Sequence, residues 1–333
     1  MAFSLADDGN LLLVHHDDTI RMIRMRPNAA PLEEYPRLRT SAMKLCAGGC
    51  VWKDDVCVFL SAVAKTRVIV ILLEKKLNNV LYPVHCAGSP PVTGEGASMA
   101  RLGRDHIVLW GGGEVGGGAS GYGVLSLCLW VWVDFTTMPN RPNSTHPPAR
   151  SHASLTSLEN EPGGVVLFGG LENDSTLSNR LDFLSLKMEW ELDMRIGGAL
   201  PPARSKHAAC PVSDGLIIHG GIGINGLQLD DVFLLHVSRS FTDWHWSEAT
   251  FQGVRLSRSG HVIACPGATG EIVVFGGSRD QSSSCRDSND SFSADTSSNM
   301  PTELCIVVDR ICDNVDHGTR TLAHPPPIQR LSC

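Results

Sequence analysis

Three arginines hold the same place in a repeated motif, and their side chains are the best candidates for binding chemistry. Arg150 and Arg204 each end a Pro-Pro-Ala-Arg sequence, and Arg258 has the equivalent place in a third copy. Arg39 is a candidate fourth member. A guanidinium group is planar and permanently charged, so it binds carboxylates and phosphates through paired hydrogen bonds. The series predicts either a site for an acidic partner or local pairing with Asp side chains and carbonyl groups.

The arginines belong to a sequence unit that the chain repeats. After Arg150, Arg204 and Arg258 come a His and a run of apolar strand-forming residues that ends in two glycines. A Trp follows later in the first two of these copies. The glycine pairs lie about 50 residues apart, which is typical of four-stranded repeat units. Strand formers bounded by Gly, Pro, Asp and Asn predict short antiparallel strands and tight turns. The recurring residues are His152, His207 and His261, Gly169-Gly170, Gly220-Gly221 and Gly276-Gly277, and Trp190 and Trp246.

These recurring residues are interpreted as structural. Paired glycines at the end of a strand let neighbouring backbones approach closely and permit unusual φ values. A recurring Trp suits the space between twisted sheets, where its ring is buried and its indole N–H finds a partner. Histidines that hold equivalent places in separate units are expected to form structural hydrogen bonds rather than a joint site.

The repeat resembles the kelch repeats, which build β-propellers. The resemblance is clearest over residues 90–309 and weaker over residues 1–89, where the units are degenerate. It implies an all-β, six-bladed β-propeller that forms a single domain over residues 1–333. Because an open edge strand invites aggregation, we expect the chain ends to close the ring. In that case the tail, residues 310–333, reaches the N-terminal blade.

Earlier strands can be placed by running the repeat backwards. Asn10–His15 and Thr19–Met25 are expected to pair in an incomplete first blade. A second blade is expected from a hairpin within Cys46–Leu60 and a strand at Arg67–Leu73. The longest apolar run, Val124–Val133, has the length of a strand.

The resemblance also implies a function. In kelch proteins that recognise acidic peptides, arginines at this motif position line the binding face together with neighbouring loops. The leading interpretation is a non-catalytic protein-protein interaction module, an adaptor, a scaffold or a subunit of a hetero-complex, with no cofactor. The alternatives are a propeller enzyme of the oxidase or sugar-epimerase type and the propeller subunit of a modification enzyme that acts in trans. The loops expected at the face are Gly113–Tyr122, Leu171–Asn179, Ile222–Leu229 and Ser278–Pro301.

Charge and composition limit the classes of partner that the protein is expected to bind. A net charge of −7 argues against a nucleic-acid surface, which requires a broad basic patch. No apolar stretch approaches the ~20 residues of a membrane span, and the N-terminus does not have the pattern of a secretion signal. We therefore expect a cytoplasmic protein with reduced cysteines and no membrane contact. The Cys and His spacings do not match a metal site, and the Ser-rich stretch 278–301 is expected to be a disordered insertion.

Overall fold

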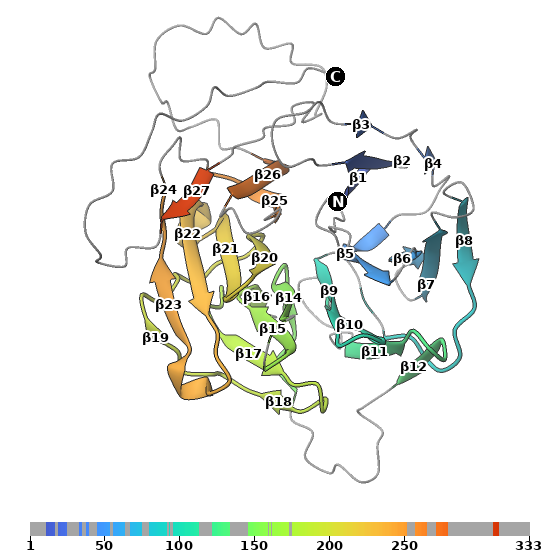
Figure 1. Ribbon diagram of the computed structural model, residues 1–333, viewed down its shortest axis with the longest axis horizontal. Coiled ribbons are helices and arrows are strands. Elements are labelled where there is room, and N and C mark those ends of the chain that lie inside the picture. The colour runs from blue at the N-terminus through green and yellow to red at the C-terminus, as the bar shows by residue number, and fades with distance from the viewer. Residues whose placement is uncertain are drawn as a thin grey trace, which may run out of the picture.

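The strands form a ring of six antiparallel units in the computed structural model of the chain (Figure 1). Among the described residues, no helix is long and apolar enough to cross a bilayer. Two 3-10 helices, Ile224–Gly226 and Phe241–Asp243, lie in connections between strands. The structure describes residues 11–16, 19–24, 33–34, 38–39, 45–53, 56–63, 67–74, 80–91, 93, 96–112, 122–133, 146–158, 160, 162–172, 175–251, 257–264, 271–278 and 309–312.

The first three blades come from the N-terminal part of the chain. An eight-stranded sheet contains blades 2 and 3, which a parallel bridge between Ala47 and Ala97 joins. Blade 1 is β1 (Leu11–His16), β2 (Thr19–Arg24), β3 (Glu33–Glu34) and β4 (Leu38–Arg39). Blade 2 is β5 (Leu45–Lys53), β6 (Val56–Val63), β7 (Arg67–Glu74) and β8 (Val80–Val84). Blade 3 is β9 (Ala97–Leu102), β10 (His106–Gly111), β11 (Tyr122–Ser126) and β12 (Val131–Val133).

The last three blades carry the clear sequence repeats. Blade 4 is β14 (Ser154–Leu158), β15 (Gly164–Phe168), β17 (Leu181–Leu184) and β18 (Trp190–Glu191), with β13 (Arg150–Ser151) paired to β16 (Leu171–Glu172) at one end. Blade 5 is β20 (Ala208–Val212), β21 (Gly215–Ile222), β22 (Gln228–His236) and β23 (His245–Glu248). Blade 6 is β25 (Ser259–Ala264), β26 (Glu271–Ser278), β27 (Asp309–Cys312) and β24 (Thr250–Phe251).

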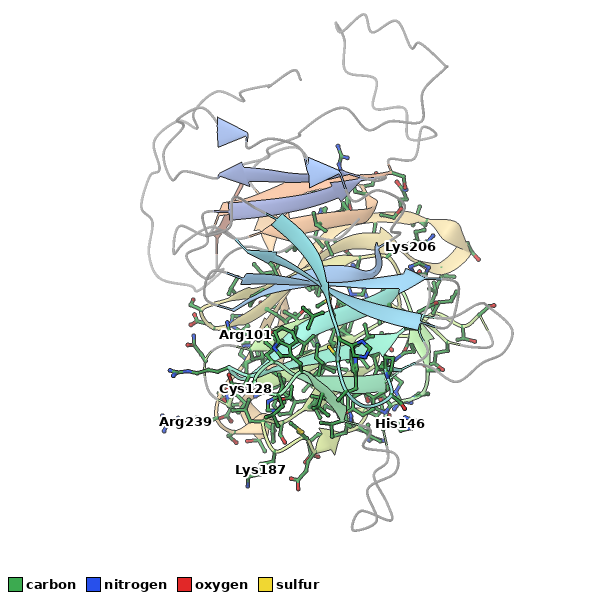
Figure 2. All side chains as sticks on the ribbon, turned by 90° about the vertical axis from the view of Figure 1, so that its right-hand side faces the viewer. Arg101, Cys128, His146, Lys187, Lys206 and Arg239 are labelled. Atoms are coloured by element: carbon green, nitrogen blue, oxygen red, sulfur yellow. The ribbon has the colours of Figure 1, made fainter. Side chains whose placement is uncertain are left out.

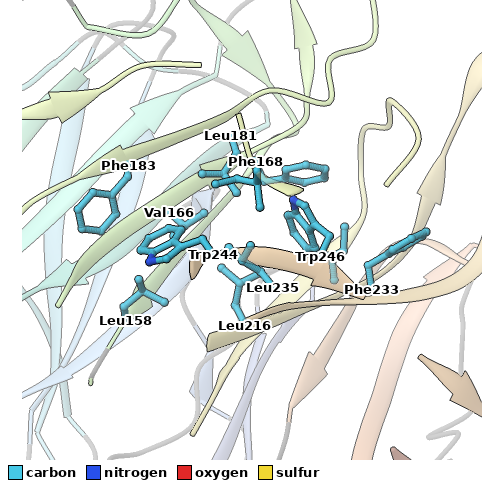
Figure 3. Packing of buried hydrophobic residues seen from close by; sticks show 12 residues of the cluster. Leu158, Val166, Phe168, Leu181, Phe183, Leu216, Phe233, Leu235, Trp244 and Trp246 are labelled. Atoms are coloured by element: carbon cyan, nitrogen blue, oxygen red, sulfur yellow. The ribbon is translucent and has the colours of Figure 1, made fainter. Parts of the chain in front are cut away.

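The hydrophobic core lies between the blades. Successive side chains of a strand point to opposite faces of its sheet, so the central strand of blade 4 contributes to two clusters. Val166 and Phe168 pack with blade 5, and Val165 and Leu167 pack with blade 3. Figure 3 shows the first cluster, in which Trp246 contacts Phe168 with ring centroids 5.2 Å apart. Trp190 likewise packs against a ring of blade 3, so the repeated Trp residues join neighbouring blades.

Linkers between blades cover the outer edges of two sheets. The segment before blade 5 forms β19 (Gly197–Gly198), which pairs in parallel with β23. The segment before blade 3 does the same through Ala87, which bridges Val131 of β12. Backbone groups that an outer strand would expose are paired in this way, which protects the edge from association with another chain.

The carboxyl end of the described chain departs from expectation. The strand β27 pairs with β26 and with β24, so residues 309–312 complete blade 6 instead of reaching blade 1. The physical reason is local: the edge of β26 needs an antiparallel neighbour, and β27 supplies it. The remaining tail, residues 313–333, and residues 279–308, which contain all but the first residue of the Ser-rich stretch 278–301, lie outside the described residues.

The long apolar run of blade 3 also differs from a single strand. Residues 127–130 form a turn between β11 and β12, and Trp130 adopts a φ of 52° there. Otherwise the predicted arrangement is confirmed: the chain is all-β, the strands of each repeat form one blade, and the fold is a six-bladed propeller.

Candidate interaction face

The motif arginines of blades 4 and 5 are internal ion-pair partners. Arg204 is 0% exposed, and its two terminal nitrogens lie 2.5 and 2.7 Å from the carboxylate oxygens of Asp231. Arg150 is 2% exposed and forms an ion pair with Asp182, whose side chain is fully buried. Each Asp lies on the third strand of the same blade, so the pair ties the start of the blade to its centre.

The prediction that Arg150 and Arg204 meet a partner is therefore wrong. Their guanidinium groups also donate to carbonyls, that of Arg204 to Gly220 at 3.0 Å and that of Arg150 to Arg180 at 3.3 Å. Burial lowers the pKa of Arg150, and the charge of Asp182 opposes that shift. The alternative interpretation, local pairing, is the correct one for both residues.

The other two arginines are placed differently. Arg258 is half-buried, and its backbone carbonyl accepts a hydrogen bond of 2.8 Å from the N–H of Gly221. Arg204 accepts an equivalent bond of 2.8 Å from Gly170, so the backbone role of the motif is repeated. Arg39 lies in β4, and its side chain lies outside the described part of the structure. Binding of a partner by Arg258 or Arg39 remains a prediction.

The glycine pairs make the close contact between blades possible. Gly169 and Gly220 have φ values of 65° and 60°, in the region that favours glycine. A Cβ at Gly169 would lie 2.8 Å from the carbonyl oxygen of Arg204, and one at Gly220 would lie 2.7 Å from that of Arg258. Each first glycine thus abuts the arginine motif of the next blade. In blade 6, Gly276 lies opposite His261 in the ladder, and Gly277 has a φ of 81°.

The three motif histidines are not all equivalent. His207 bonds Ser154 of blade 4 through Nε2 at 2.8 Å, and His261 bonds His219 of blade 5 at 2.7 Å. Both are buried and face the preceding blade. His152 instead has a φ of 56° and stands two residues after its arginine, whereas the other two stand three residues after theirs. His207 and His261 therefore hold equivalent places in their blades, and His152 holds a different one.

The true counterparts of His152 form a chain around the ring. Gly96, His152, Lys206 and Gly260 each begin a blade, with φ values of 78°, 56°, 55° and 65°. The N–H of His152 donates to the carbonyl of Gly96 at 2.8 Å. Lys206 donates to His152 at 3.0 Å, and Gly260 donates to Lys206 at 2.8 Å. Backbone hydrogen bonds thus join four residues with a left-handed backbone conformation, one from each of four consecutive blades.

This chain brings two basic side chains to one side of the ring. Lys206 is exposed and His152 is half-buried. In the edge-on view of Figure 2, Lys206 and His146 lie on one side, and Lys187 and Arg239 lie on the other. Sequence inspection missed Lys206 because its residue type differs from that of its counterparts. The available signal was its distance of two residues from the motif arginine.

A hairpin loop of blade 5 lies on the side of Lys206. Ser205 and Ile222 exchange backbone hydrogen bonds of 3.0 and 2.7 Å, which fixes the base of the loop beside Lys206. At its tip, Ile224 and Leu227 are 67% and 64% exposed. This loop falls within the range 222–229 that the sequence assigned to the binding face. We define the interaction face as His152, Lys206, Ile224 and Leu227.

Comparison with known proteins agrees with the repeat pattern. Residues 163–318 match the family model of the KLHDC2/KLHL20/DRC7 Kelch-repeats domain. Residues 163–318 are therefore kelch repeats. The solved structure of YjhT covers 84% of this chain and 91% of its own, with a TM-score of 0.62 and 12% sequence identity. At that identity the likeness shows the fold alone.

Several curated proteins share the kelch repeats with this chain. An F-box/kelch-repeat protein of Arabidopsis thaliana is 28% identical over 192 residues, which is 52% of this chain and 37% of that protein. Kelch domain-containing protein 1 of Homo sapiens is 32% identical over 34% of this chain and 27% of its own. Dynein regulatory complex subunit 7 of Chlamydomonas reinhardtii is 29% identical over 34% of this chain and 10% of its own. The chain therefore spans well under two thirds of the length of these relatives.

Proposed function

We propose that this protein is a non-catalytic interaction module that holds an acidic segment of a protein partner against the interaction face. The observation that carries the proposal is the exposed Lys206 in a left-handed conformation. A residue other than glycine costs free energy there, of the order of 1 kcal/mol. Gly96 and Gly260 hold the same backbone position without that cost. The Lys206 side chain is thus dispensable for the fold, which favours a role in contact with a partner.

The chemistry of the face determines the kind of partner. An exposed ammonium group attracts carboxylates over roughly 10 Å at moderate salt. Ile224 and Leu227 add apolar surface beside it, which suits a segment with both acidic and apolar side chains. The buried arginines do not contribute, because their charges are already paired with Asp182 and Asp231.

Relatives support a role in assemblies. One is named as a subunit of the dynein regulatory complex and another as an F-box/kelch-repeat protein. We extend this to a scaffold or adaptor role within a hetero-complex. The cytoplasmic location stays a prediction.

The replacement Lys206→Gly tests the proposal without disturbing the backbone. Wild-type and variant chains are tagged and captured from the native cells, and the retained partner is then purified for equilibrium binding. We expect Lys206→Gly to fold as well as the wild type and to bind the partner about tenfold more weakly, the loss of one charged hydrogen bond. Raised salt should weaken the wild type more than the variant.

A control variant shows whether the loss of affinity is specific to the side of the ring that carries Lys206. Lys187→Ala removes a lysine from the opposite side of the ring (Figure 2) and should leave affinity unchanged. A partner that Lys206→Gly binds with wild-type affinity contradicts the proposed face. Capture of no stoichiometric partner by the wild type contradicts the interaction module itself.

A further inference from the structure

A buried pair of histidines joins blades 5 and 6. His219 lies in β21 and is 3% exposed, and His261 lies in β25 and is 4% exposed. Nδ1 of His219 and Nε2 of His261 are 2.7 Å apart, and the two rings meet edge to face with centroids 4.7 Å apart. A polar contact thus replaces part of the apolar packing at this junction.

The pair departs from the pattern of the other blades. His219 immediately precedes a glycine pair, and Phe168 and Phe275 precede the pairs of blades 4 and 6. In blade 3, Trp110 precedes the pair Gly111-Gly112. At the junction between blades 4 and 5, Phe168 meets His207 with ring centroids 5.4 Å apart. An aromatic side chain without a titratable group therefore satisfies this position elsewhere in the ring.

The hydrogen bond leaves no place for a second proton. Nδ1 of His261 is buried and has no hydrogen-bond partner among the described residues. If Nδ1 of His261 carries no proton, the ring proton is on Nε2 of His261, which donates to Nδ1 of His219. In this tautomer the N–H of the His261 ring has an acceptor. An additional proton must then either break this bond or create an unpaired charge on His261, and both are costly inside a protein.

The surroundings disfavour that proton on balance. Burial is the largest cause and lowers the pKa of His219 to about 4; Asp231 and Asp230 oppose this, and Arg204 and Arg258 add to it. Burial, His219, Arg258 and His207 lower the pKa of His261 well below its usual value. An unfolded histidine has a pKa of about 6.5. The unfolded chain therefore takes up protons as the pH falls below about 6.5, and stability decreases.

We propose that the His219–His261 pair is an acid-sensitive latch, which holds the junction of blades 5 and 6 at neutral pH and releases it when the pair takes up a proton. The released junction adjoins the interaction face, because Gly260 and Lys206 at its end share a backbone hydrogen bond of 2.8 Å. The latch depends only on the two imidazoles and their surroundings, so it operates whatever partner the protein holds.

The replacement His219→Phe tests the latch, since Phe168 and Phe275 hold the same place in their blades. The full chain is unfolded in urea at intervals from pH 7.5 to pH 4.5, and proton uptake on unfolding is obtained from the slope of stability against pH. We expect the wild type to lose stability steeply below pH 6.5. The variant should take up about one proton fewer near pH 5.

A second histidine serves as a matched control. His245 is exposed and stacks on His236 with ring centroids 4.4 Å apart, so His245→Phe removes a histidine outside the junction. This variant should keep the wild-type dependence on pH. Equal pH dependence in His219→Phe and the wild type overturns the latch.

Imidazole NMR of the wild type keeps the proposal testable if His219→Phe fails to fold. In protein labelled with 15N at histidine, the resonances of His219 and His261 should stay those of neutral rings at pH 5.5 while the protein is folded. Their protonation should accompany loss of the junction. Titration of both rings near pH 6.5 in the intact fold overturns the proposal.

Discussion

Arg204 and Lys206 are two residues apart, yet one is fully buried and the other is exposed. The difference follows from the chain direction at the start of blade 5. Arg204 points into the blade toward Asp231, and Lys206 takes a left-handed turn at the surface. The sequence indicates which residues recur, but the burial of a long side chain depends on whether a partner such as Asp231 lies across the sheet. That partner is 27 residues away in the chain.

Replacement of Arg204 should unfold the protein more readily rather than weaken a partner contact alone. Arg204→Ala leaves Asp231 and the Gly220 carbonyl without their donors in a buried setting. We expect a loss of about 3–5 kcal/mol in the free energy of unfolding, measured in urea. Lys206→Gly, two residues away, is the control, and its free energy of unfolding should not decrease. A loss below about 1 kcal/mol for Arg204→Ala contradicts the structural role of the pair.

Among the elements, the linker strands that cover blade edges depend on glycine. Gly198 of β19 has a φ of 88°, and a Cβ there would overlap the carbonyl oxygen of Trp246. Gly197 beside it has no atom within 4 Å of the place where its Cβ would lie. The two glycines look alike in the sequence, but only Gly198 is required by the approach of the linker to β23.

The pair of glycines therefore gives a matched test of the linker. Gly198→Ala should lower the free energy of unfolding by more than about 1 kcal/mol, because the positive φ and the nearby carbonyl of Trp246 both disfavour Ala. It should also speed hydrogen exchange at the N–H of Ala199, which donates to Trp246 at 2.9 Å. Gly197→Ala should change neither the free energy of unfolding nor the exchange rate at Ala199. Equal effects of the two replacements would show that the linker does not cover the edge as described.

Some elements could be read from the sequence and others could not. The sequence predicts the strands that precede the glycine pairs, because runs of Val, Ile, Leu and Phe that end in Gly have few alternative structures. The apolar run Val124–Val133 has no visible division in the sequence, since its turn contains none of the usual turn residues. Trp130 provides the turn with a positive φ. Residue type hides the shift of His152 by one position, which only its distance from the arginine reveals.

At the scale of the whole molecule, the ring of like blades follows from the period of the repeat. Each unit can bury its apolar faces only against its neighbours, so a regular period predicts a ring of like sheets. The ring also gives the molecule two sides, with Lys206 on one and Lys187 on the other (Figure 2). The sequence could not supply this division, because it depends on how the strands connect in space.

Lysine footprinting of the captured complex is the measurement that tests the interaction face most directly. The free protein and the native complex are acetylated under identical conditions, and the modification of each lysine is measured by mass spectrometry. Partner binding is predicted to protect Lys206 and leave Lys187 as reactive as in the free protein. Protection of Lys187 with Lys206 unchanged would place the partner on the opposite side of the ring and contradict the proposed function of the face.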